Sequence, residues 1–316
     1  AIKQSSDTDS TVQFLLRRMN HKKDFPAFSQ TISVLNRAHN SETESLSTIS
    51  NAILKDISLT NKLLRIVNSA FYNRGGGKIS TISRAVVMLG IDPVRSLAVS
   101  LMLFEHLQNK LQANQLIEDS VTSLFSALLA NDMALANNVK QHEEAFLCAL
   151  LQQLGKLLVR FYLHEESLAI DKQVAQFGEE ESTAALKILG THYYELGMAV
   201  AGEWGFPQQI INSMKPITEQ QLSKKGTEND KLHLIANFSN SISQGLKDST
   251  QEPSVVIENI SKKYEKVLKT DSKKIKVMVE SSQKEMKNFA KLINFNLEKS
   301  SFYKKLTADT EDTPEV

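Results

Sequence analysis

The chain has 316 residues, which is enough to bury a sizeable core in one large domain or two smaller ones. Its 41% hydrophobic and 23% charged residues are ordinary for a globular protein, and a net charge of +1 gives no reason to expect a nucleic acid or a membrane as partner. The single cysteine, Cys148, excludes an internal disulfide and indicates a cytoplasmic setting. It lies in an apolar run, which is typical of a buried side chain and not of a catalytic thiol.

The first half of the chain shows the apolar spacing of helices. The pattern predicts helices over residues 11–19, 29–38, 46–54 and 57–70. A glycine-rich break follows at 74–78, and the next helix, which contains Val86, stops at Gly90. Asp92 and Pro93 then open a further helix, with Asp as the cap and Pro at the first helical position.

The second half is predicted to be helical as well. Apolar-patterned segments cover residues 120–137, 143–161, 180–189, 193–204, 208–214 and 231–246, and the polar stretch 218–230 is predicted to be a loop. No stretch shows strand alternation, no repeat of fixed period is present, and no apolar run is long enough to predict a membrane span. We therefore expect an all-α fold.

The composition also predicts how the chain is divided. We expect an N-terminal helical subdomain at 1–110 and a second helical subdomain at 111–250. A charged helical extension follows at 251–306, in which Lys and Glu surround apolar residues at helical spacing. This extension should fold back on the second subdomain, because an isolated helix with a narrow apolar stripe is marginal in water. The acidic residues 307–316 are predicted to be disordered.

The usual signatures of enzymes are missing from the sequence. The Gly75–Gly77 run lacks the Lys-Ser/Thr ending of a phosphate loop, and neither a HExxH nor a GxSxG motif occurs. The seven histidines are scattered singly, so no local cluster of metal ligands is present. We therefore expect neither a metal nor another cofactor.

Two stretches of sequence are far more specific. One runs over residues 56–72 and ends in Leu-Leu-Arg-x-x-Asn-Ser-Ala-x-Tyr, and the other, over 85–97, carries Leu-Gly-x-x-x-x-Arg-x-Leu. In these stretches the chain resembles the HDOD family, a regulatory branch related to the HD metal-dependent phosphohydrolases. The resemblance covers roughly residues 24–246. It implies an HD-related bundle of many helices and a role in bacterial signal transduction.

The polar residues of the two signature stretches admit two interpretations. Asp56 is placed to cap the helix that follows it, and Asn68 and Ser69 are placed to hold loose backbone groups at its end. Arg65 lies on the same helix face as Asn68, Tyr72 closes the motif, and Arg95 can pair with a carboxylate. Together these residues form either a buried polar network that fixes helix packing or a recognition surface for a partner.

The resemblance also implies where the metal ligands of the HD enzymes would stand. Gln152 and Gln153 occupy the place of the His-Asp pair, because Leu154-Gly155-Lys156 follows them. By the same register the other ligand positions fall on Thr122, Tyr193, Met214, Lys215 and Asn237. None of these side chains supplies an anion at neutral pH, and Lys215 adds a positive charge.

Without a metal there is no activated hydroxide and no Lewis acid to cleave a phosphate ester. We therefore expect no enzymatic activity, and a regulatory module of signal transduction that acts by binding signalling proteins. An alternative is a sensor that binds a nucleotide or another small molecule in the emptied HD cleft. A third, less favoured alternative is a residual metal-dependent phosphohydrolase.

Overall fold

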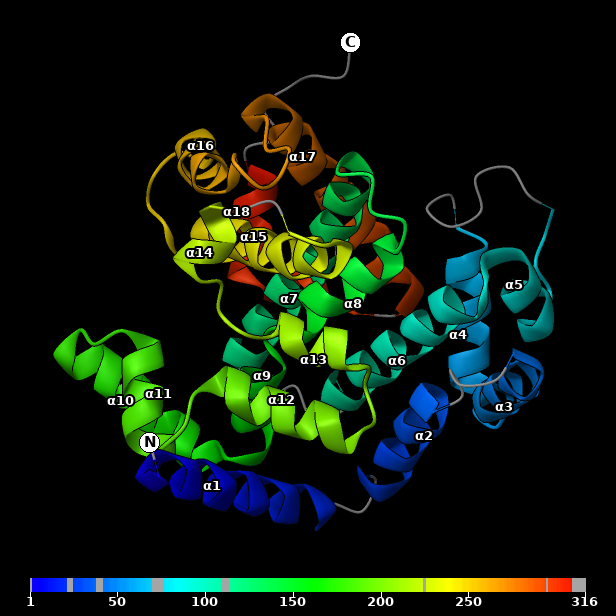
Figure 1. The fold of residues 1–316 in the computed structure, drawn as a ribbon, viewed down its shortest axis with the longest axis horizontal. Helices are drawn as coiled ribbons and strands as arrows, with labels where there is room; N and C mark the ends of the chain where they lie inside the picture. The colour runs from blue at the N-terminus through cyan, green and yellow to red at the C-terminus, as the bar shows by residue number, and fades with distance from the viewer. Residues whose placement is uncertain are drawn as a thin grey trace.

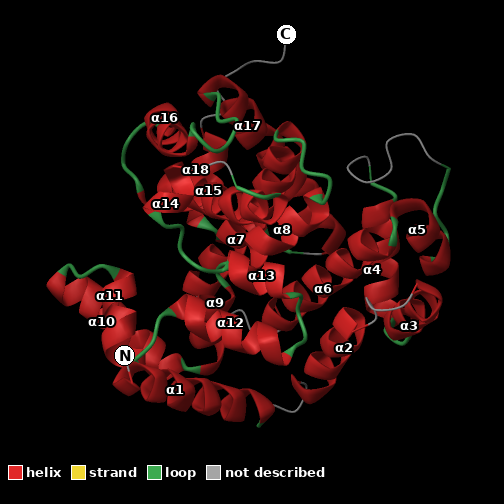
Figure 2. Ribbon diagram, in the orientation of Figure 1, coloured by secondary structure: helices red, strands yellow, loops and turns green. Residues whose placement is uncertain are grey.

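The computed structural model describes residues 2–21, 25–37, 42–69, 77–108, 114–223, 226–293 and 295–308, and in them it shows helices and no strand (Figures 1 and 2). The all-α prediction is confirmed. The helices are α1 (Ile2–Asn20), α2 (Phe25–Arg37), α3 (Glu42–Leu54), α4 (Ile57–Val67), α5 (Ile82–Leu89), α6 (Ile91–Gln108), α7 (Asn114–Ala136), α8 (His142–Leu151), α9 (Leu154–Tyr162), α10 (His164–Phe177), α11 (Glu181–Leu189), α12 (Tyr193–Glu203), α13 (Gln208–Ser213), α14 (Glu219–Ser223), α15 (Glu228–Asp248), α16 (Pro253–Tyr264), α17 (Ser272–Ile293), the 3₁₀ turn η2 (Leu297–Lys299) and α18 (Ser301–Ala308).

Helices α2 to α6 pack on one another and form one end of the molecule. The long helix α6 leads from them into the second group of helices, where it packs on α8 (Figure 1). Phe28 of α2 meets Trp204 at the end of α12 edge to face with ring centroids 5.6 Å apart, and the Asn36 side chain donates to the carbonyl of Trp204 at 3.1 Å. The two groups of helices are thus joined by both aromatic and polar contacts.

The second group is built around α7, α8 and α15. Helix α7 packs on α8, α9 and α15, and nearly all of its side chains are buried. Gly155 lets α9 approach α12 closely, because a Cβ atom there would lie 1.8 Å from the Tyr193 carbonyl oxygen. This close contact fixes α9 against α12, which begins at the predicted ligand position Tyr193.

Helix α1 lies outside the group formed by α2 to α6. It packs mainly on α12 and α9, and the Thr11 hydroxyl donates to the Leu189 carbonyl at 2.6 Å. Its inward face consists of Val12, Leu15 and Met19, all of them buried. The predicted subdomain 1–110 includes α1, whereas α1 packs mainly on two helices of the other group; apolar spacing shows that a helix has a buried face but not which partner covers it.

The extension α16 to α18 packs on α15, α7 and α4. Aromatic pairs join it to the rest of the fold: Tyr264 with Phe238, Phe289 with Phe104, and Phe302 with Phe125. Helix α18 continues to Ala308, two residues beyond the predicted end of the helical extension, and the remainder of the acidic stretch lies outside the described residues.

Other boundaries differ from the prediction where tertiary packing prevails over local pattern. Helix α4 ends at Val67 and not at residue 70, because Asn68 caps it. The predicted helix 143–161 is two helices, α8 and α9, separated at Gln152 and Gln153. Helix α10 escaped prediction because only Ser167 and Ile170 of it are buried, and the short α14 lies in the predicted loop 218–230 with no buried residue.

One segment of the described chain, His142–Tyr162, is long and apolar enough to cross a membrane by length and composition alone. In the fold 78% of it is buried by other helices, and it is divided between α8 and α9. Such burial is the property of a core helix, so the segment gives little support to a membrane span.

Candidate functional site

The two glutamines at the position of the His-Asp pair lie where α8 ends and α9 begins. The Gln152 side chain donates to the Ser213 carbonyl at 2.7 Å, which brings the end of α13 and the adjoining Met214 to this break. The Gln153 amide lies 3.5 Å from the side-chain oxygen of Asn240. Both amides are therefore bonded within the fold, and Met214 is buried beside them.

Asn237 and Lys215 meet through the backbone. The Asn237 amide lies 3.3 Å from the Lys215 carbonyl, and His233 Nε2 lies 2.6 Å from the same oxygen. A carbonyl only accepts, so Nε2 carries the proton, and Nδ1 accepts from the Gln221 amide at 3.2 Å. Burial lowers the pKa of His233 below its ordinary value, which agrees with this neutral form. The Lys215 side chain itself is exposed.

Asn240, one turn beyond Asn237, belongs to this group although the sequence register did not select it. Its amide donates to the carbonyls of Ala149 and Ala236 at 3.0 and 3.1 Å, so it ties α15 to the end of α8. An alignment with a distant family cannot decide between two asparagines that lie three residues apart on one face of a helix. The contact with Gln153 identifies Asn240 as the residue of α15 that faces the former His-Asp position.

Thr122 and Tyr193 have partners of their own. Thr122 is fully buried in α7, and its hydroxyl donates to the Glu118 carbonyl one turn earlier at 2.7 Å. The Tyr193 hydroxyl lies 3.3 Å from the Glu181 carboxylate. The structure therefore places Gln152, Gln153 and Met214 together at the α8–α9 break, and Asn237 meets Lys215 just beyond Met214. Among the described residues, Thr122 and Tyr193 make no side-chain hydrogen bond to this group.

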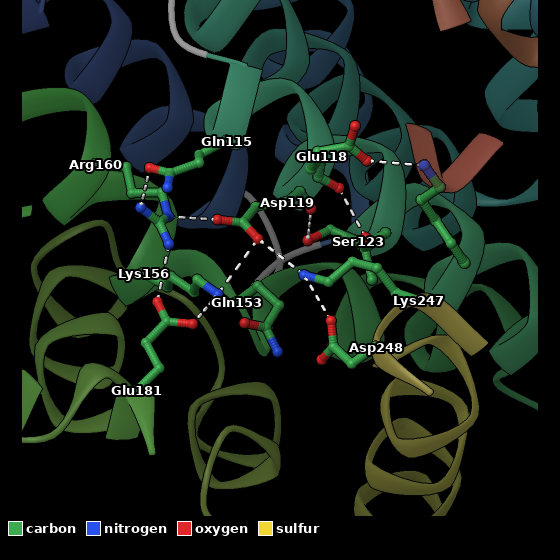
Figure 3. A network of polar contacts seen from close by, with 12 residues as sticks. Gln115, Glu118, Asp119, Ser123, Gln153, Lys156, Arg160, Glu181, Lys247 and Asp248 are labelled. Carbon is green, nitrogen blue, oxygen red and sulfur yellow. Dashed lines mark hydrogen bonds and ion pairs between the residues drawn. The ribbon is translucent and has the colours of Figure 1, made fainter. Parts of the chain in front are cut away.

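A buried network of charges lies beside these positions, and the sequence reasoning missed it (Figure 3). At its centre is Asp119 of α7, whose carboxylate lies 2.6 Å from Arg160 Nε and 3.3 Å from Lys156 Nζ, both on α9. Lys247 of α15 approaches the same carboxylate to 3.4 Å. The side chains of Asp119, Lys156 and Arg160 are less than a tenth exposed.

Two further carboxylates complete the network. Glu181 of α11 lies 2.7 Å from Lys156 and 2.9 Å from Arg160, and Asp171 of α10 lies 3.2 Å from Arg160. Asp119, Asp171 and Glu181 thus face Lys156, Arg160 and Lys247, and the three negative charges balance the three positive ones. We call these six residues the ion network.

The pKa shifts follow this arrangement. Burial alone would raise the pKa of Asp119, but Lys156, Arg160 and Lys247 outweigh it and hold the pKa below its ordinary value. Burial would lower the pKa of Lys156, yet Asp119 and Glu181 raise it above the ordinary value. Burial, together with the Glu181 charge, raises the pKa of Tyr193, so its hydroxyl stays neutral. Asp119 and Lys156 are therefore both held in their charged forms.

The HD enzymes of this fold imply a divalent metal, and the residues present here do not fit one. Within the described chain, no three His, Cys, Asp or Glu side chains are arranged to hold a metal ion. The amides of Gln152 and Gln153 are bonded to groups of the fold, and the nearby carboxylates already face Lys156 and Arg160. A cation entering here would meet two or more positive side chains and no free anionic ligand.

Three of the family-signature residues form local backbone contacts. Asp56 accepts from the Leu59 amide at 3.0 Å as the cap of α4, and the Ser69 hydroxyl donates to the Ile66 carbonyl at 2.7 Å. Asn68 donates to the carbonyls of Leu64 and Ile79, both at 2.7 Å, and accepts from the Ile79 amide at 2.8 Å. Asn68 therefore ties the end of α4 to the segment that leads into α5.

The other signature residues differ in exposure. Arg65 is exposed on α4, whereas Arg95 is 2% exposed on α6. Arg95 Nη2 lies 3.1 Å from the Asp92 carboxylate, a distance typical of an ion pair, but the two groups are not oriented for a hydrogen bond. The short distance and the i, i+3 spacing make an ion pair the better description. Tyr72 lies outside the described residues.

Replacing Asn68 by Ala should lower the free energy of unfolding by about 1–3 kcal/mol, because it leaves both backbone groups of Ile79 without their partner. Chemical denaturation measures this loss. Asn61→Ala, an exposed position on the same helix, is the matched control and should change stability by less than about 0.5 kcal/mol. An unchanged Asn68→Ala protein that has lost a partner would favour the recognition surface instead.

Comparison with known proteins agrees with this geometry. The model of the HDOD domain family matches residues 25–219, which is more than half of the chain. A protein of Treponema pallidum, itself uncharacterised, is 24% identical over 197 residues. The match covers 61% of this chain but only 37% of that relative, so the chain spans little more than a third of its length.

Solved structures share the fold. An HDOD domain protein of unknown function from Geobacter sulfurreducens superposes with a TM-score of 0.65 at 17% identity, covering 90% of this chain and 97% of the other. A Shewanella amazonensis chain provisionally named a phosphohydrolase gives 0.59 at 20% identity, covering 92% and 97%. A Marinobacter aquaeolei chain provisionally named a signal transduction protein gives 0.54 at 15% identity, covering 92% and 66%. With its two signature stretches and the family match over residues 25–219, the chain belongs to the HDOD domain family.

Proposed function

We propose that this chain is a non-catalytic regulatory module of signal transduction that acts by binding other proteins. The observation that carries the proposal is the state of the former metal site. Gln152 and Gln153 bond to groups of the fold, and the charges beside them cancel within the ion network. This arrangement supports a scaffold that has kept the HD-related fold but not its chemistry. The name of the Marinobacter relative is consistent with such a role.

The same observation weakens the idea of a nucleotide sensor in the emptied cleft. An anionic ligand would have to take Lys156 or Arg160 away from Asp119 and Glu181, which already neutralise them. Breaking a buried ion pair leaves a charge uncompensated, and that costs more than an exposed contact with a ligand returns. Protein binding is therefore the better proposal. We also infer a cytoplasmic setting, because a chain with the single cysteine Cys148 forms no internal disulfide.

The purified protein should contain less than about 0.1 transition-metal ion per chain and should not cleave a phosphodiester above background in added Mn²⁺ or Fe²⁺. Elemental analysis and an assay with bis-p-nitrophenyl phosphate check this. The matched variant is Gln152→Ala, which should change neither result. One or more metal ions per chain in the wild type, lost in Gln152→Ala, would contradict the proposal.

Binding of a partner is tested separately. Cross-linking and purification from the native cells should yield a discrete signalling protein, and the complex should form again from the two purified components. A panel of nucleotides should leave the melting temperature unchanged. If no purified protein binds but a nucleotide raises the melting temperature, and Lys156→Met abolishes that rise, the sensor function replaces this proposal.

A further inference from the structure

Helix α1 presents a second face, opposite to its buried side. Phe14, Arg17, Arg18 and His21 follow one another at i, i+3, i+4 and i+7, so they share one side of the helix. Together they line a shallow hollow of about 400 Å³, which we call the α1 groove. Because Val12, Leu15 and Met19 point into the fold, the α1 groove faces outward.

The α1 groove combines an aromatic surface with unpaired positive charge. The Arg18 guanidinium lies 5.3 Å from the centre of the Phe14 ring, and Arg17 and His21 make contacts only to the backbone of their own helix. In the described chain, no carboxylate pairs with Arg17, Arg18 or His21. The sequence continues with two more lysines at 22 and 23. Such a surface attracts an acidic segment.

The chain carries one segment of matching chemistry. Residues 309–316 contain Asp309, Glu311, Asp312 and Glu315 and no basic residue, and Pro314 stands among them. Carboxylates can pair with the two arginines, and a proline ring offers an apolar surface to Phe14. Both the α1 groove and this acidic segment lie outside residues 25–219, which the family model matches.

We propose that the α1 groove binds the acidic segment 309–316 of a second copy of this chain. The segment follows α18, which packs on α7 and α15, whereas α1 packs on α9 and α12. Figure 1 shows α1 along the lower edge of the fold and α18 in its upper half, with α9 and α12 between them. Eight residues reach at most about 28 Å when fully extended. A second copy can present the segment without having to span the molecule.

A synthetic peptide of residues 307–316, labelled for fluorescence polarisation, tests the contact with the full chain as receptor. We expect binding at low salt that is abolished in about 0.5 M salt, because exposed charges are screened. Arg17→Glu with Arg18→Glu should weaken binding by at least about tenfold, and Phe14→Ala by about threefold. Lys273→Glu with Lys274→Glu, the same charge change at exposed positions of α17, is the matched control and should leave binding unchanged.

Sedimentation then distinguishes the source of the segment. The full chain should associate as its concentration rises at low salt, and a chain ending at Ala308 should stay monomeric while it binds the added peptide. Thermal melts should show that all variants remain folded, since the changed side chains are exposed. The proposal is overturned if the peptide fails to bind at low salt or binds both double variants equally. A full chain that stays monomeric at every concentration overturns it as well.

Discussion

Replacing Asp119 by Ala should lower the free energy of unfolding by about 3–5 kcal/mol, the cost of removing one partner from a buried ion network. The Asp119 side chain is 4% exposed, and three cations from two helices converge on it. Without it, Lys247 loses its closest carboxylate, Lys156 keeps Glu181 alone, and Arg160 loses its shortest contact. Urea or guanidinium denaturation at neutral pH measures the loss.

The matched control for this experiment is Asp248→Ala. Asp248 lies 3.9 Å from Lys247, but its side chain is 67% exposed, so its removal should cost less than about 0.5 kcal/mol. Asp119→Asn keeps the shape and removes the charge, and it should destabilise the fold nearly as much as Ala. If Asp119→Ala and Asp248→Ala lower the free energy of unfolding equally, the buried charges of the ion network contribute little to stability.

The effect of Asp119 should also depend on pH in a defined direction. Its pKa in the folded state lies below the ordinary value of an aspartate, so the stability that the charged carboxylate contributes is fully present above that ordinary value. It is lost as the pH falls through the lower pKa of the folded state, where the carboxylate takes up a proton. The gap in stability between wild type and Asp119→Ala should therefore stay constant near neutral pH and narrow only in strong acid. If this difference in stability already disappears between pH 6 and 8, a group other than Asp119 is responsible for it.

The ion network shows why part of the site could not be predicted from the sequence. Arg160 and Lys247 lie 41 and 128 residues from Asp119, and nothing local indicates that they meet. The sequence did contain a weaker indication of charged residues in the core. Lys156 and Arg160 lie one turn apart on α9 among buried apolar residues, and Asp119 lies in α7, most of whose side chains are buried. Charged side chains on a buried helix face need partners, but the sequence does not name them.

What the sequence did predict depends on local pattern. The cap at Asp56 could be expected because the Leu59 amide lies three residues away, and Asn68 bonds Ile79 eleven residues on, across the short glycine-rich break that follows its helix. The position of Gln152 and Gln153 followed from the Leu-Gly-Lys frame, and Gly155 has a visible physical reason in the close approach of α12. Tyr193 and Thr122 were assigned by register alone, and their bonds are to Glu181 and Glu118.

Cutting the chain after Gln251 should leave no stably folded protein. The extension buries a large set of apolar side chains: Val256, Ile257, Tyr264, Leu268, Ile275, Val279, Met286, Phe289, Ile293, Phe295, Leu297, Phe302, Tyr303 and Leu306. Their removal also uncovers apolar side chains of the remaining helices, among them Phe104, Phe125 and Phe238, and exposing a buried side chain of this size costs about 1.5–3 kcal/mol. The truncated chain should aggregate or lack a cooperative melt.

Two shorter truncations locate the contribution of α18. A chain ending at Ala308 loses no described helix and should melt like the full chain. A chain ending at Phe295 loses η2 and α18, which uncovers Phe125 and removes the groups that hold Glu118. In the intact fold the Glu118 carboxylate accepts from the Ser300 and Ser301 hydroxyls at 2.8 and 2.7 Å and from the Phe302 amide at 3.1 Å.

The chain ending at Phe295 should therefore still fold, but with a melting temperature clearly below that of the chain ending at Ala308. Lys305, which donates to the carbonyls of Lys247 and Ser249 at the end of α15, is lost with α18 and adds to the drop. Calorimetry of the three truncations beside the full chain gives the order directly. If the chain cut after Gln251 stays soluble, monomeric and as stable as the full chain, the extension is a linker, and its buried aromatic contacts do not hold the core together.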